Sequence, residues 1–263
     1  MEVTDMEIER QGLAPLLPPR VRAFFIPAAL TLCILPFGWV GVAAPLAWLA
    51  LNGIERSTGW SRALLFVAAA AIMLLAALGT IPSAPRIELL PPYSDSAGNS
   101  IGNAFNPGKA AIAVAVMVFM AGRKQRPLRQ DLPLLLLLVL LPIVVAIPFS
   151  GFSPKLSATI LLAMLVNLAV VCISEEAFFR WVLQRGAEEL LGQWRWLAVP
   201  PVVAIFTLLH TGWAASPPVL ALVALAGFAY ATLWYLRRKF WLCVLAHWGV
   251  NSLHMLLLTY PLG

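Results

Sequence analysis

The chain has 263 residues, of which 61% are hydrophobic and only 11% are charged. A soluble domain carries about 25% charged residues, so this composition excludes an ordinary soluble protein and predicts a polytopic membrane protein. The net charge of +6 does not indicate nucleic-acid binding, because the basic residues gather at the ends of apolar segments, as they do in membrane proteins.

Eight apolar segments lie along the chain, each near the roughly 20 residues that a helix needs to cross a bilayer. They cover 23–51, 63–81, 104–122, 132–152, 156–174, 195–213, 216–236 and 240–260. The fold class is therefore expected to be all-α, a transmembrane bundle of about eight helices. The first segment contains Pro36-Phe37-Gly38 and is either one tilted helix or a helical hairpin.

Three parts of the chain are expected to differ in role. Residues 1–22 lack the pattern of a cleavable signal peptide and are interpreted as an extramembrane segment. Residues 23–155 carry few polar groups inside their apolar segments and are interpreted as helices for packing and access. Nearly all side chains capable of chemistry fall in 156–260, which is interpreted as the catalytic core. The polar stretch 82–108 is expected to be a connecting loop.

The distribution of Lys and Arg predicts the orientation. Both are most frequent in the loops after the first, third, fifth and seventh segments, with Arg237-Arg238-Lys239 as one example. Because such loops stay on the cytoplasmic face, these four loops are expected to share that side of the membrane. We expect an integral, multi-pass protein of a bacterial plasma membrane.

The best lead to function is a charged cluster at membrane depth, Glu175-Glu176 followed by Arg180. It comes directly after the uncharged run Leu156–Ile173. An ionised group at that depth costs about 2.5–3.5 kcal/mol, so it is kept only when it pairs, faces a polar cavity or does chemistry. Glu176 and Arg180 are four residues apart and can pair on one helix face. Glu175 is rotated by about 100° and can serve as a general base. The alternative is an ion pair at the membrane interface with no catalytic role.

Three histidines follow on later segments. His247 and Asn251 are four residues apart and share a face, where an imidazole and a carboxamide can bind an oxyanion or position a water. His210 ends an apolar run and is either a site residue or a hydrogen-bonded packing residue. His254 is a possible further partner or a packing histidine, and Asn167 is one more polar group in the same half of the chain.

A metal site is possible but is not favoured by the sequence. If a metal were present, Glu175, His210 and His247 would be its ligands, since two imidazoles and a carboxylate form a plausible zinc set. The chain has neither H-E-x-x-H nor Cys-x-x-Cys. We therefore expect no cofactor. The three cysteines all lie in apolar segments, which is typical of small buried residues; they are Cys33, Cys172 and Cys243.

Glu175-Glu176-Ala-Phe-Phe-Arg180 resembles the E-E-x-x-x-R motif of the CPBP family of intramembrane proteases. This family includes the type II CAAX prenyl endopeptidases and the bacteriocin-processing and immunity proteins known as Abi. The resemblance implies a supporting ion pair between Glu176 and Arg180. Glu175 is implied to be the base that activates a water, by a glutamate-type mechanism that needs no metal.

Two further motifs follow in the family's order. Phe206-Thr-Leu-Leu-His210 is similar to F-x-x-x-H, and His247-Trp-Gly-Val-Asn251 is similar to H-x-x-x-N. The resemblance implies that His210 acts with Glu175 on the water, while His247 and Asn251 stabilise the tetrahedral oxyanion. Each motif alone is weak, but three in order on successive apolar segments form a specific pattern.

The expected function is that of an intramembrane endopeptidase cutting a peptide bond near the membrane surface. Its partners would be membrane lipid and a peptide or protein substrate, which can be membrane-anchored or lipidated, with no nucleic acid. One alternative is a non-catalytic peptide-binding scaffold or immunity protein. Another is an ion- or proton-coupled transporter, which predicts polar lining along several helices or an internal repeat, neither of which the sequence shows.

Aromatic residues near the first motif allow two interpretations. They line a groove for peptide or lipid, or they form the interfacial belt found at the ends of membrane helices, and the belt is favoured. The residues are Phe178, Phe179, Trp181, Trp194, Trp196 and Trp213.

Overall fold

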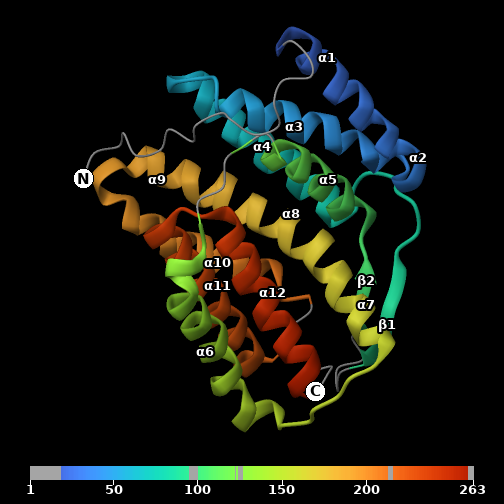
Figure 1. Ribbon diagram of the computed structural model, residues 1–263, viewed down its shortest axis with the longest axis vertical. Helices are drawn as coiled ribbons and strands as arrows, with labels where there is room; N and C mark the ends of the chain where they lie inside the picture. Colours follow the sequence, from blue (N-terminus) through green and yellow to red (C-terminus); the bar gives the residue numbers. More distant parts are fainter. Residues whose placement is uncertain (1–18, 95–99, 122, 124–126, 213–215, 260–263) are drawn as a thin grey trace. The chain divides into compact units, whose positions relative to one another are not determined.

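Figure 1 shows the computed structural model, which describes residues 19–94, 100–121, 123, 127–212 and 216–259. The predicted all-α membrane bundle is confirmed. The described residues include five helical stretches long and apolar enough to cross a membrane, and shorter apolar helices at 23–37, 39–54 and 107–121. The chain is thus an integral, multi-pass membrane protein, while eight crossings remain a prediction.

The described residues form two compact units, one comprising those up to 84 and from 107 to 127, and the other those of 85–106 and from 128 onward. The second unit contains α6 (Leu132–Ser150), which the sequence groups with the N-terminal helices. The reason is packing, because α6 lies against α11 (Pro217–Arg237) and α12 (Phe240–Leu257). The expected division of roles between the two halves of the chain stays a prediction.

In the first unit, the first apolar segment is a hairpin of two short helical arms rather than one tilted helix. The arms are broken at Gly38, whose φ of 74° and ψ of −165° suit glycine alone. After this break the chain turns back so closely that a Cβ on Gly41 would lie 2.4 Å from the backbone of Cys33. The elements of this unit are α1 (Pro19–Leu30), η2 (Thr31–Cys33), α2 (Ile34–Phe37), η3 (Trp39–Val42), α3 (Ala43–Ile54), α4 (Gly59–Leu78) and α5 (Pro107–Ala121).

Small side chains let the helices of the first unit approach one another. α3 packs against both α4 and α5. Membrane helices gain little free energy from burying apolar surface against each other. Their association depends instead on close packing of the backbones, which small side chains allow. The fully buried alanines here are Ala44, Ala47, Ala69, Ala111 and Ala115.

The second unit is built around one long helix, continuous from residue 158 to residue 191 (Figure 1, yellow to orange). It begins where the Ser157 Oγ accepts the N–H of Ile160 at 3.1 Å, and it ends before Gly192, which has a φ of 54°. Its parts are α7 (Ala158–Val166), η5 (Asn167–Cys172), α8 (Ile173–Glu176), η6 (Ala177–Gln184) and α9 (Arg185–Leu191). Of these, η5 and η6 are π-helical, with wider turns than an α-helix.

The other elements of the second unit pack against this helix or against one another. The turn η4 (Arg129–Asp131) leads into α6, and η7 (Gly192–Ala198) leads into α10 (Val199–Leu209). A hairpin of β1 (Ile87–Ser94) and β2 (Ser100–Phe105) lies within the stretch that was expected to be a plain loop. Leu90 of this hairpin packs on Ile160 and Ala163 of α7 and on Met255 of α12, which fixes the hairpin to the helices.

Ion pairs join η4, α9 and the connection from the end of α11 to α12 at one end of the second unit. Asp131 contacts Arg237 Nε at 2.8 Å and Lys239 Nζ at 2.5 Å, and Glu188 pairs with Arg238. These residues follow the third, fifth and seventh predicted segments, whose shared side of the membrane stays a prediction. At the opposite end, the N–H of Ser153 donates to the carbonyl of Leu257 at 2.8 Å.

The aromatic residues near the first motif divide into two groups. Phe178, Phe179 and Trp181 are buried, so the belt interpretation is wrong for them. They pack in the helical core because the helix that carries them is enclosed by its neighbours. Trp194 and Trp196 are half exposed, as residues of a belt would be. Trp213 lies outside the described residues.

Candidate active site

The first motif lies in the middle of the long helix and forms a fully buried ion pair. Arg180 Nε donates to Glu176 Oε2 at 3.1 Å, and neither side chain is exposed. This is the pairing that the four-residue spacing predicts. Arg180 also donates to Gln184 Oε1 at 3.0 Å and to the Gly227 carbonyl at 3.5 Å. The guanidinium therefore has a charged partner and polar neighbours in an apolar environment, which a buried charge requires.

The polar row continues along the helix. Gln184 Nε2 donates to Glu188 Oε1 at 3.1 Å and to the Ala231 carbonyl at 2.9 Å. Four residues of an α-helix turn through about 400°, so such a row would drift around the helix. The wider turns of η6 rotate less per residue and keep the row aligned. We overlooked Gln184 and Glu188 in the sequence, although the repeated four-residue step was visible there.

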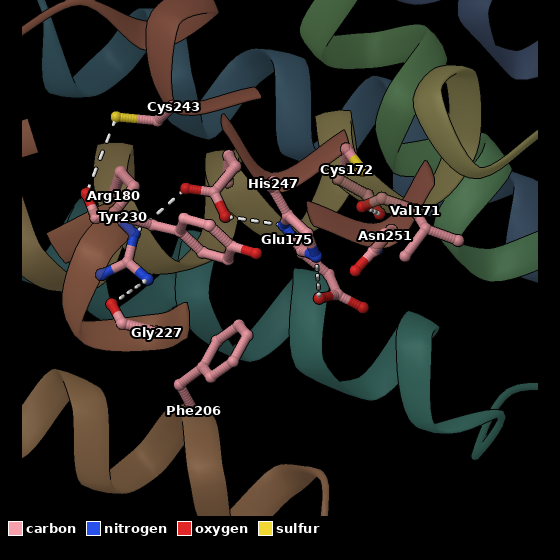
Figure 2. Close-up of polar contacts among 12 residues, drawn as sticks. Val171, Cys172, Glu175, Arg180, Phe206, Gly227, Tyr230, Cys243, His247 and Asn251 are labelled. Carbon is pink, nitrogen blue, oxygen red and sulfur yellow. Dashed lines mark hydrogen bonds and ion pairs between the residues drawn. The ribbon is translucent and has the colours of Figure 1, made fainter. Parts of the chain in front are cut away.

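His247 approaches this ion pair from α12. Its Nδ1 lies 2.8 Å from Glu176 Oε1 (Figure 2). A carboxylate held by an arginine can only accept here, so Nδ1 carries the proton and donates. The ring stacks on Tyr230 at 4.8 Å with an interplanar angle of 20°. The neighbouring Trp248 Nε1 donates to the Met164 carbonyl at 2.9 Å and docks α12 on α7. These contacts turn His247 Nε2 towards Glu175.

His210 stands at the C-terminal end of α10. Its Nδ1 lies 2.6 Å from the Phe206 carbonyl, and the two rings lie 4.4 Å apart. Because a carbonyl only accepts, Nδ1 donates and Nε2 is left without a proton in the neutral ring. This gives the F-x-x-x-H spacing a physical reason. The residue four before the histidine supplies both a carbonyl for Nδ1 and an aromatic face for the imidazole.

The position of Phe206 depends on Gly227, which leads to a prediction. A Cβ at Gly227 would lie 2.7 Å from Phe206 Cδ1, whereas one at Gly212 would meet nothing within 4 Å. Gly227→Ala is therefore expected to displace the ring that supports His210 and to destabilise the protein by about 1–3 kcal/mol through overpacking. Thermal unfolding in detergent measures this, with Gly212→Ala as the control. Equal melting temperatures of the two variants would contradict the prediction.

Glu175 brings the two histidines together. Its Oε2 lies 3.9 Å from His210 Nε2 and also 3.9 Å from His247 Nε2, and its side chain is only 11% exposed. Both distances exceed direct hydrogen-bond length, and such a gap is of the size that a bridging water fills. A carboxylate oxygen and two imidazole nitrogens from three helices thus approach one another.

Asn251 lies one turn beyond His247 on α12, as its spacing predicts. Its Nδ2 donates to Asn167 Oδ1 at 3.1 Å. The sequence had marked Asn167 as a polar group without giving it a role. His254 is a further turn along α12, beside Met255 of the core cluster at the end of the unit.

The arrangement does not fit a metal centre. Among the residues that the structure describes, no group of three or more His, Cys, Asp and Glu side chains is arranged to hold a metal ion. Glu176 is engaged by Arg180 and His247, and the two buried cysteines donate elsewhere, Cys172 to Asn167 Oδ1 and Cys243 to the Tyr230 carbonyl. We therefore derive no chemistry through zinc, and the absence of a cofactor remains a prediction.

One of three comparisons with known proteins found a match, and it falls on the part of the chain that carries the site. Residues 157–253 match the family model described as type II CAAX prenyl endopeptidase Rce1-like. This range contains every motif residue of the site and leaves out the N-terminal helices. The comparison with curated proteins and that with solved structures gave no match. The part of the chain that carries the site, residues 157–253, is thus similar to the Rce1-like type II CAAX prenyl endopeptidases.

Proposed function

We propose that the protein is an intramembrane endopeptidase that hydrolyses a peptide bond near the membrane surface, with Glu175 as its general base. One observation carries the proposal: Glu175 Oε2 lies at the same 3.9 Å from the Nε2 atoms of His210 and His247. A water in that space would donate one proton towards Glu175 and the other towards His210. In an apolar cavity where water is scarce, a fixed base makes that one water nucleophilic.

The two histidines differ in the group behind each ring, which supports different roles. His247 donates its Nδ1–H to the Glu176 carboxylate, a charged acceptor, at 2.8 Å. His210 is backed by the neutral Phe206 carbonyl and suits a neutral acceptor. A protonated His247 Nε2 and the second Nδ2–H of Asn251 would donate to the oxyanion.

In the reaction, the water oxygen attacks the carbonyl carbon as its proton passes to Glu175 Oε2. The carbonyl electrons move to the oxygen that His247 and Asn251 stabilise. When the tetrahedral intermediate collapses, the C–N bond breaks and Glu175 returns the proton to the leaving amine. Water is consumed, one acid and one amine are formed, and the residues return to their starting state.

The substrate belongs to the proposal at the level of class. Because the site lies on membrane helices, a peptide or protein segment that reaches the bilayer fits best, including one that is membrane-anchored or lipidated. Membrane lipid is the second partner, nucleic acid is not one, and the bacterial plasma membrane is the proposed location. No metal or other cofactor takes part in the proposed mechanism.

A cleavage assay tests the proposal. Wild-type protein, His210→Ala and His247→Ala are each incubated with a peptide library in liposomes, with and without a chelator. We expect wild-type cleavage that survives chelation, and losses of about 10²–10⁴-fold in both variants. Ser174→Ala is the control, because the Ser174 hydroxyl bonds to carbonyls of its own helix, Val170 at 2.6 Å and Val171 at 3.1 Å.

Three outcomes would contradict the proposal. Loss of cleavage on chelation with rescue by zinc would replace the metal-free mechanism. Undiminished cleavage by both histidine variants would remove the histidines from it. An inactive wild-type protein that still binds peptides would favour the scaffold or immunity alternative.

A further inference from the structure

We propose that Asn167 is a positioning residue that holds the Asn251 carboxamide ready for the oxyanion, and that the Cys172 thiol in turn holds Asn167. The inference rests on the proposed function, in which Asn251 donates to the oxyanion. It concerns two residues outside the three motifs, which lie eight and three residues before Glu175 on the long helix.

The evidence is a three-residue hydrogen-bonded cluster. Asn167 Oδ1 accepts from Asn251 Nδ2 at 3.1 Å and from Cys172 Sγ at 3.1 Å. Asn167 is 7% exposed and Cys172 is fully buried. A carboxamide among apolar helices is costly unless its polar atoms are satisfied, so these contacts hold the side chain of Asn167 in one orientation. Figure 2 shows Cys172 and Asn251 together to one side of His247.

The π-helical turn η5 creates this cluster. It runs from Asn167 to Cys172, so the two residues are five apart. In an α-helix, a residue five positions along points about 140° away, and the thiol would face a different neighbour. The i to i+5 hydrogen bonding of a π-helix brings it back above Asn167. Such turns are frequent at functional sites, and here the turn supplies a second donor to the oxygen that receives Asn251.

The contact with Asn167 determines what Asn251 offers to a substrate. One N–H of its Nδ2 is used by Asn167, and the other N–H of the same nitrogen remains for the oxyanion. If the acceptor is removed, the carboxamide can turn and present its oxygen to a developing negative charge. Because a preorganised donor acts mainly in the transition state, the loss should appear in kcat rather than in KM.

Kinetic analysis of variants tests the role. Asn167→Leu keeps the approximate size and removes the acceptor, while Asn167→Asp keeps an acceptor oxygen at the same place. We expect Asn167→Leu to lower kcat at least about tenfold with little change in KM, and Asn167→Asp to retain most activity. Likewise, Cys172→Ser should stay closer to wild type than Cys172→Ala does. Ser174→Ala, on the same helix, is the matched control.

A double mutant separates positioning from general stability. In the Asn251→Ala background, Asn167→Leu should lower kcat by no more than about twofold, because the residue through which it acts is gone. An equally large loss in that background would overturn the proposal. So would an Asn167→Asp variant that is as inactive as Asn167→Leu while melting like the wild type.

A measurement independent of activity distinguishes this inference from the proposed function. The chain contains six asparagines, so ¹⁵N-asparagine labelling gives few side-chain amide signals, and that of Asn251 is identified by its loss in Asn251→Gln. We expect Asn167→Leu, but not Ser174→Ala, to shift this signal. An unshifted signal would refute the contact and the proposal, whatever the enzyme does. A signal that shifts in Asn167→Leu, together with a wild-type protein that cleaves no peptide, would instead contradict the proposed function.

Discussion

Replacing Glu175 by Gln is expected to lower kcat by about 10²–10⁴-fold and to leave the fold intact. Glutamine keeps the shape of the side chain but cannot take a proton from a water between the two histidines. The buried ion pair uses the neighbouring Glu176, so the contacts that hold Arg180 and His247 are retained. The measurement is kcat and KM on a cleaved peptide, together with thermal unfolding in the same detergent.

Glu189→Gln is the matched control for this variant. Glu189 lies on the same long helix, and its carboxylate pairs with Arg185 Nε at 3.0 Å, with 30% of its side chain exposed. The same loss of a carboxylate charge, placed away from the histidines, should leave kcat unchanged. If Glu175→Gln retains more than a tenth of wild-type activity, Glu175 is not the general base.

Arg180→Ala is expected to destabilise the protein by about 3–5 kcal/mol, because it leaves a buried carboxylate without its cation. Arg180 and Glu176 are both fully buried, and Arg180 also donates to Gln184 and to the Gly227 carbonyl. Removing the guanidinium therefore leaves the Glu176 charge uncompensated and also takes a hydrogen-bond donor from Gln184 Oε1 and from the Gly227 carbonyl. A low yield of folded protein and a strongly lowered melting temperature are the expected results.

Two comparisons sharpen this prediction. Glu189→Ala breaks an ion pair with the same four-residue spacing whose carboxylate is partly exposed, and should cost no more than about 1 kcal/mol. Combining Arg180→Met with Glu176→Gln removes both charges, and should recover part of the stability lost in Arg180→Ala. A wild-type melting temperature in Arg180→Ala would show that the pair is dispensable.

The local pattern of the sequence predicted much of the fold and of the site. Low charge and long apolar runs gave the membrane class, because the bilayer sets both composition and helix length. The four-residue spacings predicted that Glu176 meets Arg180, a contact present at 3.1 Å. The four-residue spacing predicts this contact even though Arg180 lies in the π-helical η6, because the turns of η6 keep the polar side chains in one row.

Other features could not be predicted from the sequence, each for a physical reason. The contact between Asn167 and Cys172 depends on a π turn, and a pattern analysed at about 100° per residue places those side chains on different faces. The first apolar segment could not be assigned until Gly38 was seen with a positive φ and the chain after it was seen to fold back. The β1–β2 hairpin was missed because its residues carry the Pro, Gly and Asn typical of loops.

By itself, the sequence determined that this is a membrane protein, which residues share a helix face, and which three motifs it carries in order. These properties follow from periodicity within one helix, which needs no partner. Tertiary structure alone decided that His247 meets Glu176 through Nδ1, 71 positions away, and that both Nε2 atoms face Glu175. The rotation of one helix against another is set by packing contacts such as that of Trp248 with Met164, and no pattern within a single helix encodes it.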